Sequence, residues 1–195
     1  MGKARARWIT QTGVFLAILI VGQLATRPLG NTFVTGSVNN MLLILAVMLC
    51  GLSSAAVIAA ISPVFATMIG IGALWPFVPV IIAGNIVLVA LWHLIAFRQS
   101  EQGRIREIAA HRPAGSGKAR QIIALVVAAA VKFAILYIGI AKLIVPVVLG
   151  FPEPKASAVS AAFSWPQIVT ASIGGLVAML LYPALSRALP KKPRP

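Results

Sequence analysis

Long apolar segments on either side of one basic segment limit the possible folds of this chain more than any other feature of its sequence. Residues 41–69 carry no charged side chain, and residues 121–149 carry only Lys132 and Lys142. About 20 consecutive apolar residues are enough for a helix to cross a bilayer. The only long internal polar segment, residues 98–120, contains Arg98, Arg104, Arg106, Arg112, Lys118 and Arg120, together with Glu101 and Glu107. Short loops rich in Lys and Arg stay cytoplasmic, so this segment predicts which way the chain faces.

The composition indicates an all-α integral membrane protein. The chain has 195 residues, of which 59% are hydrophobic and 10% are charged, whereas soluble domains carry roughly 25% charged residues. The net charge is +14, from 17 basic and 3 acidic residues. Because the basic residues gather at the N-terminus, in the central segment and in the C-terminal tail, they indicate orientation in a lipid bilayer and argue against nucleic-acid binding.

The apolar pattern predicts a single membrane domain, residues 1–195, built as a six-transmembrane-helix bundle with both termini cytoplasmic. A glycine and two serines in residues 51–54 predict a turn that splits the uncharged run in two. The start of the chain resembles the basic region of a signal peptide but lacks a small-residue cleavage site, so we expect the first helix to be retained. The predicted helices cover about residues 8–25, 38–50, 53–69, 77–97, 120–149 and 164–187, and the basic cytoplasmic loop covers residues 98–119.

The first predicted external loop, residues 26–40, is polar and contains glycine. A plain connector needs only about four to six residues, so its length suggests a function. Asn39 and Asn40 lie where the next predicted helix enters the membrane. They either orient a ligand or cap that helix.

Among the polar side chains inside predicted spans, Asn85, Lys132 and Lys142 stand out by their depth or charge. Asn85 lies about 12 Å into its helix and needs a partner from another helix or from a ligand. Lys132 lies about 18 Å from Arg120 along its helix, near the middle of the membrane. Burying a cation there costs much free energy, so this lysine is a functional-site candidate. The alternative is a structural lysine bound to backbone carbonyls. Lys142 lies about 33 Å from Arg120, and its side chain is expected to reach the outer surface.

Aromatic and amide side chains near the predicted external rim suggest a site for a small molecule. Trp75, Phe151 and Trp165 could stack on a flat ligand, and amide side chains could orient it. The charged groups near this rim are mostly cationic, which favours a neutral or anionic ligand over a cation. The candidate substrate-binding residues are Asn39, Asn40, Trp75, Asn85, Lys132, Lys142, Trp165 and Gln167.

The sequence lacks the residues that several kinds of protein function require. The chain has no aspartate, and none of its three glutamates lies in a span, which disfavours a proton-coupled carrier. Two histidines and the single Cys50 lie in different segments and make no metal site. The sequence GSGK at residues 115–118 fails as a phosphate-binding loop, because Ala119 follows it and Arg112 stands at the earlier glycine position. We therefore expect no enzyme and no cofactor.

A set of short motifs occurs in a recognisable order along the chain. They are Cys50-Gly51, Ser62-Pro63-Val64-Phe65, Trp75-Pro76, Gly84-Asn85, Phe163-Ser164-Trp165-Pro166-Gln167 and Gly174-Gly175. Together they resemble the substrate-binding S component of energy-coupling factor (ECF) transporters over roughly residues 8–188. The resemblance implies a multi-pass protein of the prokaryotic plasma membrane that captures a water-soluble vitamin or related micronutrient from outside, beneath its first, third and fifth loops. It also implies assembly with a membrane coupling subunit and two ATPases, whose ATP hydrolysis topples the S component and releases the substrate inside.

The resemblance further implies that small residues on the first helix contact the coupling subunit. Gly13 and Ala17 are the matching positions, and Gly13 departs from the alanine usual in the family. By themselves, small residues at this spacing could equally pack against another helix of the same chain. The acidic residue that many family members have near position 85 is absent. Two other functions fit the sequence, namely a small membrane scaffold and a stand-alone small-solute carrier.

Overall fold

The computed structural model describes residues 2–70, 72–97 and 117–188, and every regular element in these ranges is helical. Before the central basic segment lie α1 (Gly2–Thr26), α2 (Thr32–Cys50), α3 (Leu52–Met68) and α4 (Val78–Ala96). After it lie α6 (Lys118–Leu136), η3 (Tyr137–Leu149), α7 (Lys155–Ala162) and α8 (Pro166–Ala188). Single 3-10 turns, η1 (Arg27–Leu29) and η2 (Trp75–Phe77), follow α1 and precede α4. Most of the predicted basic loop, residues 98–116, lies outside the described residues.

Local sequence explains where the helices break. Asn31 caps α2, because its side-chain oxygen accepts a hydrogen bond from the backbone N–H of Phe33 at 2.9 Å. Gly51 separates α2 from α3 with φ +89°, a conformation that side chains other than glycine rarely adopt. Pro63 lies inside α3 without ending it.

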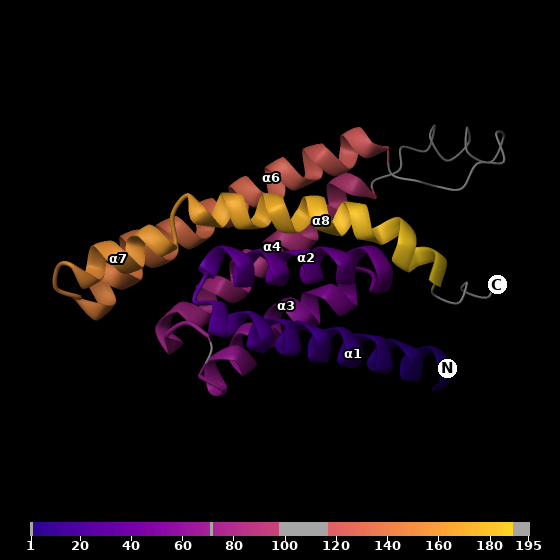
Figure 1. Cartoon of the computed structure of the whole chain (residues 1–195), viewed down its shortest axis with the longest axis horizontal. Coiled ribbons are helices and arrows are strands. Elements are labelled where there is room, and N and C mark those ends of the chain that lie inside the picture. Colours follow the sequence, from indigo (N-terminus) through magenta and orange to yellow (C-terminus); the bar gives the residue numbers. More distant parts are fainter. Residues whose placement is uncertain (1, 71, 98–116, 189–195) are drawn as a thin grey trace.

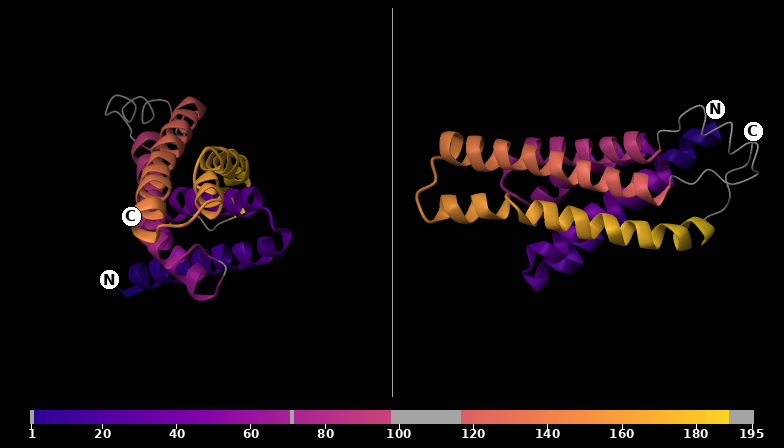
Figure 2. Two further views of the ribbon diagram at one scale, coloured as in Figure 1. Left: turned by 90° about the vertical axis from the view of Figure 1, so that its left-hand side faces the viewer. Right: turned by 90° about the horizontal axis from the view of Figure 1, so that it is seen from above.

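α6 and η3 form one continuous helix of 32 residues, Lys118–Leu149, whose last 13 residues are π-helical. This length exceeds what a single bilayer crossing needs. Figure 1 shows that η3 and α7 extend beyond the other helices at one end of the molecule. Figure 2 shows α8 running back alongside α6.

The helices form a bundle in which α2 is central and contacts α1, α3, α4 and α8. Most of the second half of α2 is buried, including Leu43 and Ile44. Trp92 of α4 is the largest fully buried side chain among the described residues. Large apolar side chains also cover the outside of the bundle, for example Val126 of α6 and Leu180 of α8. Helices that are apolar on all sides are typical of membrane spans.

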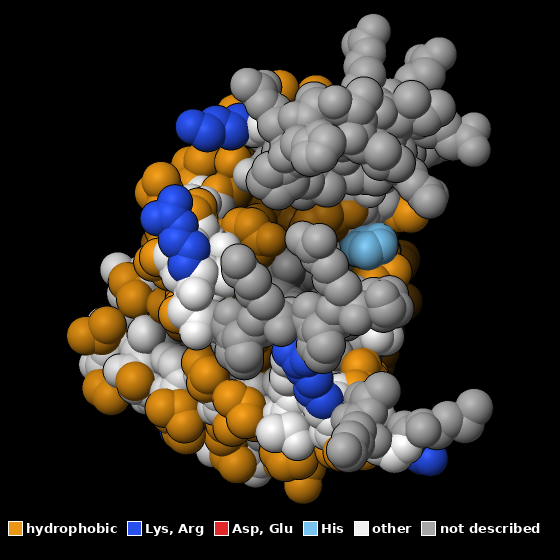
Figure 3. All heavy atoms as spheres, turned by 90° about the vertical axis from the view of Figure 1, so that its right-hand side faces the viewer, with side chains coloured by type: hydrophobic (Ala, Val, Ile, Leu, Met, Phe, Trp, Pro, Cys, Tyr) orange, Lys and Arg blue, Asp and Glu red, His pale blue; other side chains and the backbone are white. Residues whose placement is uncertain are grey.

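Both described chain ends lie at the same end of the bundle (Figure 1). Basic side chains occur at the adjoining ends of α1, α6 and α8. Figure 3 views this face, with its Lys and Arg side chains among apolar ones. At this end α1 is joined to α3 by hydrogen bonds from Trp8 Nε1 to Ser53 Oγ (3.1 Å) and from Thr12 Oγ1 to Ser54 Oγ (3.0 Å).

The all-helical fold predicted from the sequence is confirmed, and five described helices are long and apolar enough to cross a membrane, with α3 a shorter sixth at 17 residues. Two segments expected to be loops are partly helical: the first external loop, and the residues between the predicted helices 120–149 and 164–187. Most of residues 26–40 belongs to η1 and α2, and residues 150–163 contain α7. The small and polar residues of early α2 are helical because they pack against α8, where a Cβ on Gly36 would lie 3.0 Å from Thr170 Cγ2. Close packing has overridden weak local helix propensity.

Candidate functional site

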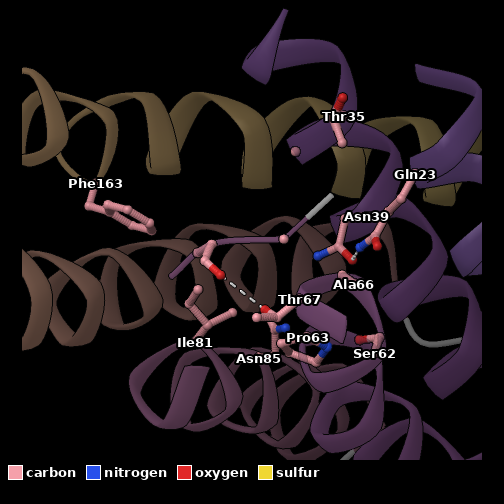
Figure 4. A pocket seen from close by; sticks show the side chains of 13 residues that line it. Gln23, Thr35, Asn39, Ser62, Pro63, Ala66, Thr67, Ile81, Asn85 and Phe163 are labelled. Carbon is pink, nitrogen blue, oxygen red and sulfur yellow. Dashed lines mark hydrogen bonds between the residues drawn. The ribbon is translucent and has the colours of Figure 1, made fainter. Parts of the chain in front are cut away.

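A cavity lies between the helices at the end of the bundle away from both termini. It is bounded by the last turns of α1 and α3, the first turns of α2 and α4, the α3–α4 connection and the end of α7 (Figure 4). Its volume is about 240 Å³, a little below the roughly 300–1,000 Å³ of ordinary ligand pockets. The lining residues are Gln23, Thr35, Gly36, Asn39, Ser62, Pro63, Ala66, Thr67, Gly72, Ala73, Ile81, Asn85 and Phe163. The cavity suits a compact small molecule.

The cavity walls contain polar atoms that the protein itself leaves unsatisfied. Gln23 donates a hydrogen bond from Nε2 to Asn39 Oδ1 at 2.8 Å, but Gln23 Oε1 has no donor. Ser62 Oγ also lacks a partner, although the residue is fully buried. Unpaired buried polar atoms are uncommon in native proteins and need an explanation. A polar molecule bound in the cavity would supply the missing partners.

The connection between α3 and α4 closes one side of the cavity. Gly72 folds back onto the end of α3, where its N–H donates to Ala66 O at 2.8 Å. Thr67 Oγ1 donates to Ala73 O at 3.1 Å (Figure 4). A Cβ at Gly72 would lie 2.6 Å from Thr67 N, so the backbone approaches too closely for any other residue.

Behind the cavity lies a buried lysine. Lys132 of α6 is 3% exposed, and its Nζ donates to Asn40 Oδ1 at 2.6 Å and to Asn85 Oδ1 at 2.7 Å. Asn40 Nδ2 in turn donates to Thr170 Oγ1 at 3.4 Å. Both partners of the lysine are neutral amides. We call these four residues, from α2, α4, α6 and α8, the amide–lysine cluster.

Close helix contacts bring these four residues together. A Cβ on Gly84 of α4 would lie 3.5 Å from Lys132 Cγ, in ordinary contact, so α4 and α6 approach closely beside the lysine. Between α2 and α8 there is no room at all, because a Cβ on Gly174 would lie 2.5 Å from Ser37 O. Glycine permits such helix approaches in membranes, and polar side chains there bond across helices.

Comparison with known families decides the class of this protein. The family model described as ECF transporter, substrate-specific component matches residues 7–186. The chain belongs to this family. No curated protein and no solved structure matches it. The resemblance identified from the sequence motifs is therefore confirmed, and the chain is the substrate-binding subunit of an ECF transporter and a multi-pass membrane protein.

The structure separates the predicted binding residues of this substrate-specific component into three groups. Asn39 and Asn85 line the cavity. Asn40 and Lys132 lie directly behind Asn85 in the amide–lysine cluster. The other four lie elsewhere, with Lys142 over the Tyr137 ring at 5.4 Å, Gln167 bonded to Ala162 O at 3.0 Å, and the exposed Trp75 and Trp165 outside the cavity wall.

Sequence reasoning missed several lining residues of the substrate-specific component. The predicted aromatic rim is not gathered around the cavity, since Trp165 instead lies 5.6 Å from the Phe33 ring and Phe163 contributes the lining aromatic side chain. Gln23 and Ser62 were also missed. Both are polar residues in apolar spans, the same signal that marked Asn85, and that signal could have found them.

The positions that match the family's coupling-subunit contact are exposed in this substrate-specific component. Gly13 and Ala17 are both exposed on α1, and no atom lies within 4 Å of a Cβ built at Gly13. Neither residue is covered by another described helix. The small-residue face of α1 is therefore free for a partner chain.

A second, shallower hollow lies on the outer surface between α4 and the α6–η3 helix. Its lining is Pro79, Val80, Ala83, Val131, Ala134, Ile135, Ile138 and Gly139. None of these side chains is polar, so nothing there would orient a water-soluble substrate. The polar cavity is the better substrate site.

Proposed function

We propose that this chain captures a small water-soluble vitamin or related micronutrient with high affinity, in the cavity between α1, α2, α3 and α4. The termini face the cytoplasm in this proposal, so that the cavity at the opposite end of the bundle receives substrate from outside. The basic ends of α1, α6 and α8 support this orientation, because cytoplasmic segments carry an excess of Lys and Arg.

The observation that carries the proposal is the coincidence of the cavity with unsatisfied polar atoms. Gln23 Oε1 and Ser62 Oγ both lie on its wall without hydrogen-bond partners. Asn85 joins the wall to the buried Lys132. A concave, mostly apolar space with a few converging polar groups is the usual form of a small-molecule site.

Ligand binding tests this function directly. We expect the purified full chain, in detergent and without ATP, to bind one or a few compounds from a panel of water-soluble vitamins and nucleobase derivatives. Binding would raise the thermal unfolding temperature, because a ligand that binds only the folded state stabilises it. Native mass spectrometry should show one bound molecule per chain. A panel in which no compound shifts unfolding or adds mass would contradict the proposal.

We further propose that the Gly13–Ala17 face of α1 docks on the membrane coupling subunit. Gly13→Leu should block copurification with the coupling and ATPase subunits, because the bulky side chain would separate closely packed helices. Substrate binding by the isolated chain should not change, since Gly13 is remote from the cavity lining.

Ala130→Leu provides the matched control, because Ala130 is an exposed small residue on α6, away from α1. It should leave the complex intact. Normal copurification of Gly13→Leu would contradict this docking face. Capture of unrelated membrane proteins in place of ATPase subunits would favour the scaffold function instead.

A further inference from the structure

We propose that Asn85 is a donor-only recognition group for a carboxylate, and that Lys132 is the positioning residue that orients it. The cavity then selects small monocarboxylate substrates over their neutral analogues. This inference rests on the proposed function, since it takes the cavity to be the substrate site.

The orientation of the Asn85 amide follows from the chemistry of its partner. A lysine ammonium has only donors, so an amide beside it must present oxygen rather than nitrogen. Asn85 Oδ1 accepts from Lys132 Nζ at 2.7 Å. The NH2 group must therefore point away from Lys132. Within the described residues no hydrogen bond joins this group to an acceptor, and the Asn85 side chain as a whole is 1% exposed.

The free NH2 belongs to a residue that lines the cavity (Figure 4). Asn40, the other amide held by Lys132, directs its own NH2 to Thr170 and does not line the cavity. Asn85 is thus the member of the amide–lysine cluster that presents an unused donor to a bound molecule. The Ser62 hydroxyl provides a second unused donor on the same wall.

The charge of Lys132 indicates whether the substrate group that accepts from Asn85 is neutral or anionic. Lys132 is bonded to two neutral amides, and the only acidic side chain among the described residues, Glu153, is exposed on the connection between η3 and α7. Burying a cation without an opposite charge costs free energy. An anion in the cavity would be separated from Lys132 only by the Asn85 amide, and its negative charge would offset part of that cost. A single positive charge matches a monoanionic carboxylate better than a doubly charged phosphate.

Matched pairs of acid and neutral compound test the inference on the purified full chain. The probes are nicotinate with nicotinamide, biotin with biotinamide, and pantothenate with pantothenol, each titrated by calorimetry. We expect at least one acid to bind tighter than its neutral partner by about tenfold or more, the size of one hydrogen bond to a charged group. Equal or tighter binding of the neutral members overturns the inference, while the proposed function stands. Binding of only neutral compounds in the wider panel has the same consequence, whereas no binding anywhere is the failure of the function itself.

Asn85→Asp sharpens the test because it keeps the shape of the side chain. Its carboxylate would pair with Lys132 and present an acceptor to the cavity in place of a donor. The preference should therefore reverse, with acid binding reduced by about 100-fold or more and neutral amide binding retained or improved. Asn31→Asp is the control, because it adds the same negative charge at the exposed N-cap of α2, where Asp caps a helix as well as Asn does. This variant should retain the preference for the acid. An unchanged acid preference in Asn85→Asp would overturn the assignment of Asn85.

The positioning role of Lys132 has its own readout, the ratio of acid to neutral affinity. In Lys132→Met this ratio should fall below about threefold, because the Asn85 amide is no longer held with its donor toward the cavity. Lys118→Met removes the same charge from the exposed start of α6 and should keep the ratio of the unmodified chain. An acid-to-neutral ratio that stays unchanged in Lys132→Met, whether or not both affinities fall together, would contradict the positioning role.

Discussion

Gly174→Val should strongly destabilise the fold of this protein. A Cβ at Gly174 would lie 2.5 Å from Ser37 O and 2.7 Å from Met41 N, so it meets the backbone of α2 rather than a movable side chain. The added bulk must push α8 away from the most central helix of the bundle. Overpacking of this kind costs roughly 1–3 kcal/mol and sometimes more. Since total stability is only about 5–15 kcal/mol, we expect aggregation on size-exclusion chromatography, or unfolding at a temperature lowered by roughly 2–12 °C.

Gly13→Val is the matched control. The substitution is identical and also lies within a helix, but a Cβ at Gly13 has no atom within 4 Å. Surface changes of this kind usually alter stability by no more than about 0.5 kcal/mol. The control should therefore elute and unfold like the unmodified chain. Equal behaviour of the two variants would show that α2 and α8 are not packed as closely as the structure indicates.

Lys132→Met should weaken substrate binding much more than it weakens folding. The substitution leaves two amide oxygens without a donor, which destabilises the fold, but it also removes a buried charge, which stabilises it. These effects oppose each other, so the unfolding temperature without ligand should change by only a few degrees. Affinity for the compound identified in the panel should fall by roughly 10- to 100-fold, as expected when a charge-assisted contact is lost. Calorimetry and thermal unfolding of the same preparations provide the two measurements.

Lys118→Met, at the exposed start of α6, serves as the control for loss of one positive charge. It should change neither quantity. Unaltered affinity in Lys132→Met would assign this lysine a purely structural task, holding α2 and α4 against α6. A collapse of the fold in Lys132→Met, with retained affinity in the surviving fraction, would lead to the same conclusion.

The helical spans were predictable because hydropathy acts through the bilayer, without knowledge of contacts. Uncharged runs such as residues 41–69 had to be spans, and Gly51 marked the break between two of them. The extent of α2 was not predictable in this way. Asn31 and Gly36 are typical of turns, and only the fit of Gly36 against Thr170 on α8, 134 positions later, explains why the segment is helical.

The site was predictable one residue at a time but not as an arrangement. The depth of Lys132 and Asn85 in their spans showed that each needs a partner. Lys132 donates hydrogen bonds to both Asn85 and Asn40. This arrangement depends on how α2, α4 and α6 are rotated about their axes, and the local sequence does not show that rotation. The aromatic rim does not gather around the cavity, and the sequence could not show this, because Trp residues near the ends of spans are equally typical of interfacial anchors.

The order of the amide–lysine cluster along the chain has a consequence for biosynthesis. Asn40 and Asn85 enter the membrane with α2 and α4, before α6 brings Lys132 to them, and Thr170 arrives last with α8. Both amide acceptors are therefore already in the membrane when Lys132, the side chain with the largest free-energy cost of leaving water, enters it. A chain that ended before α6 would leave both of these amide oxygens without their lysine donor in lipid.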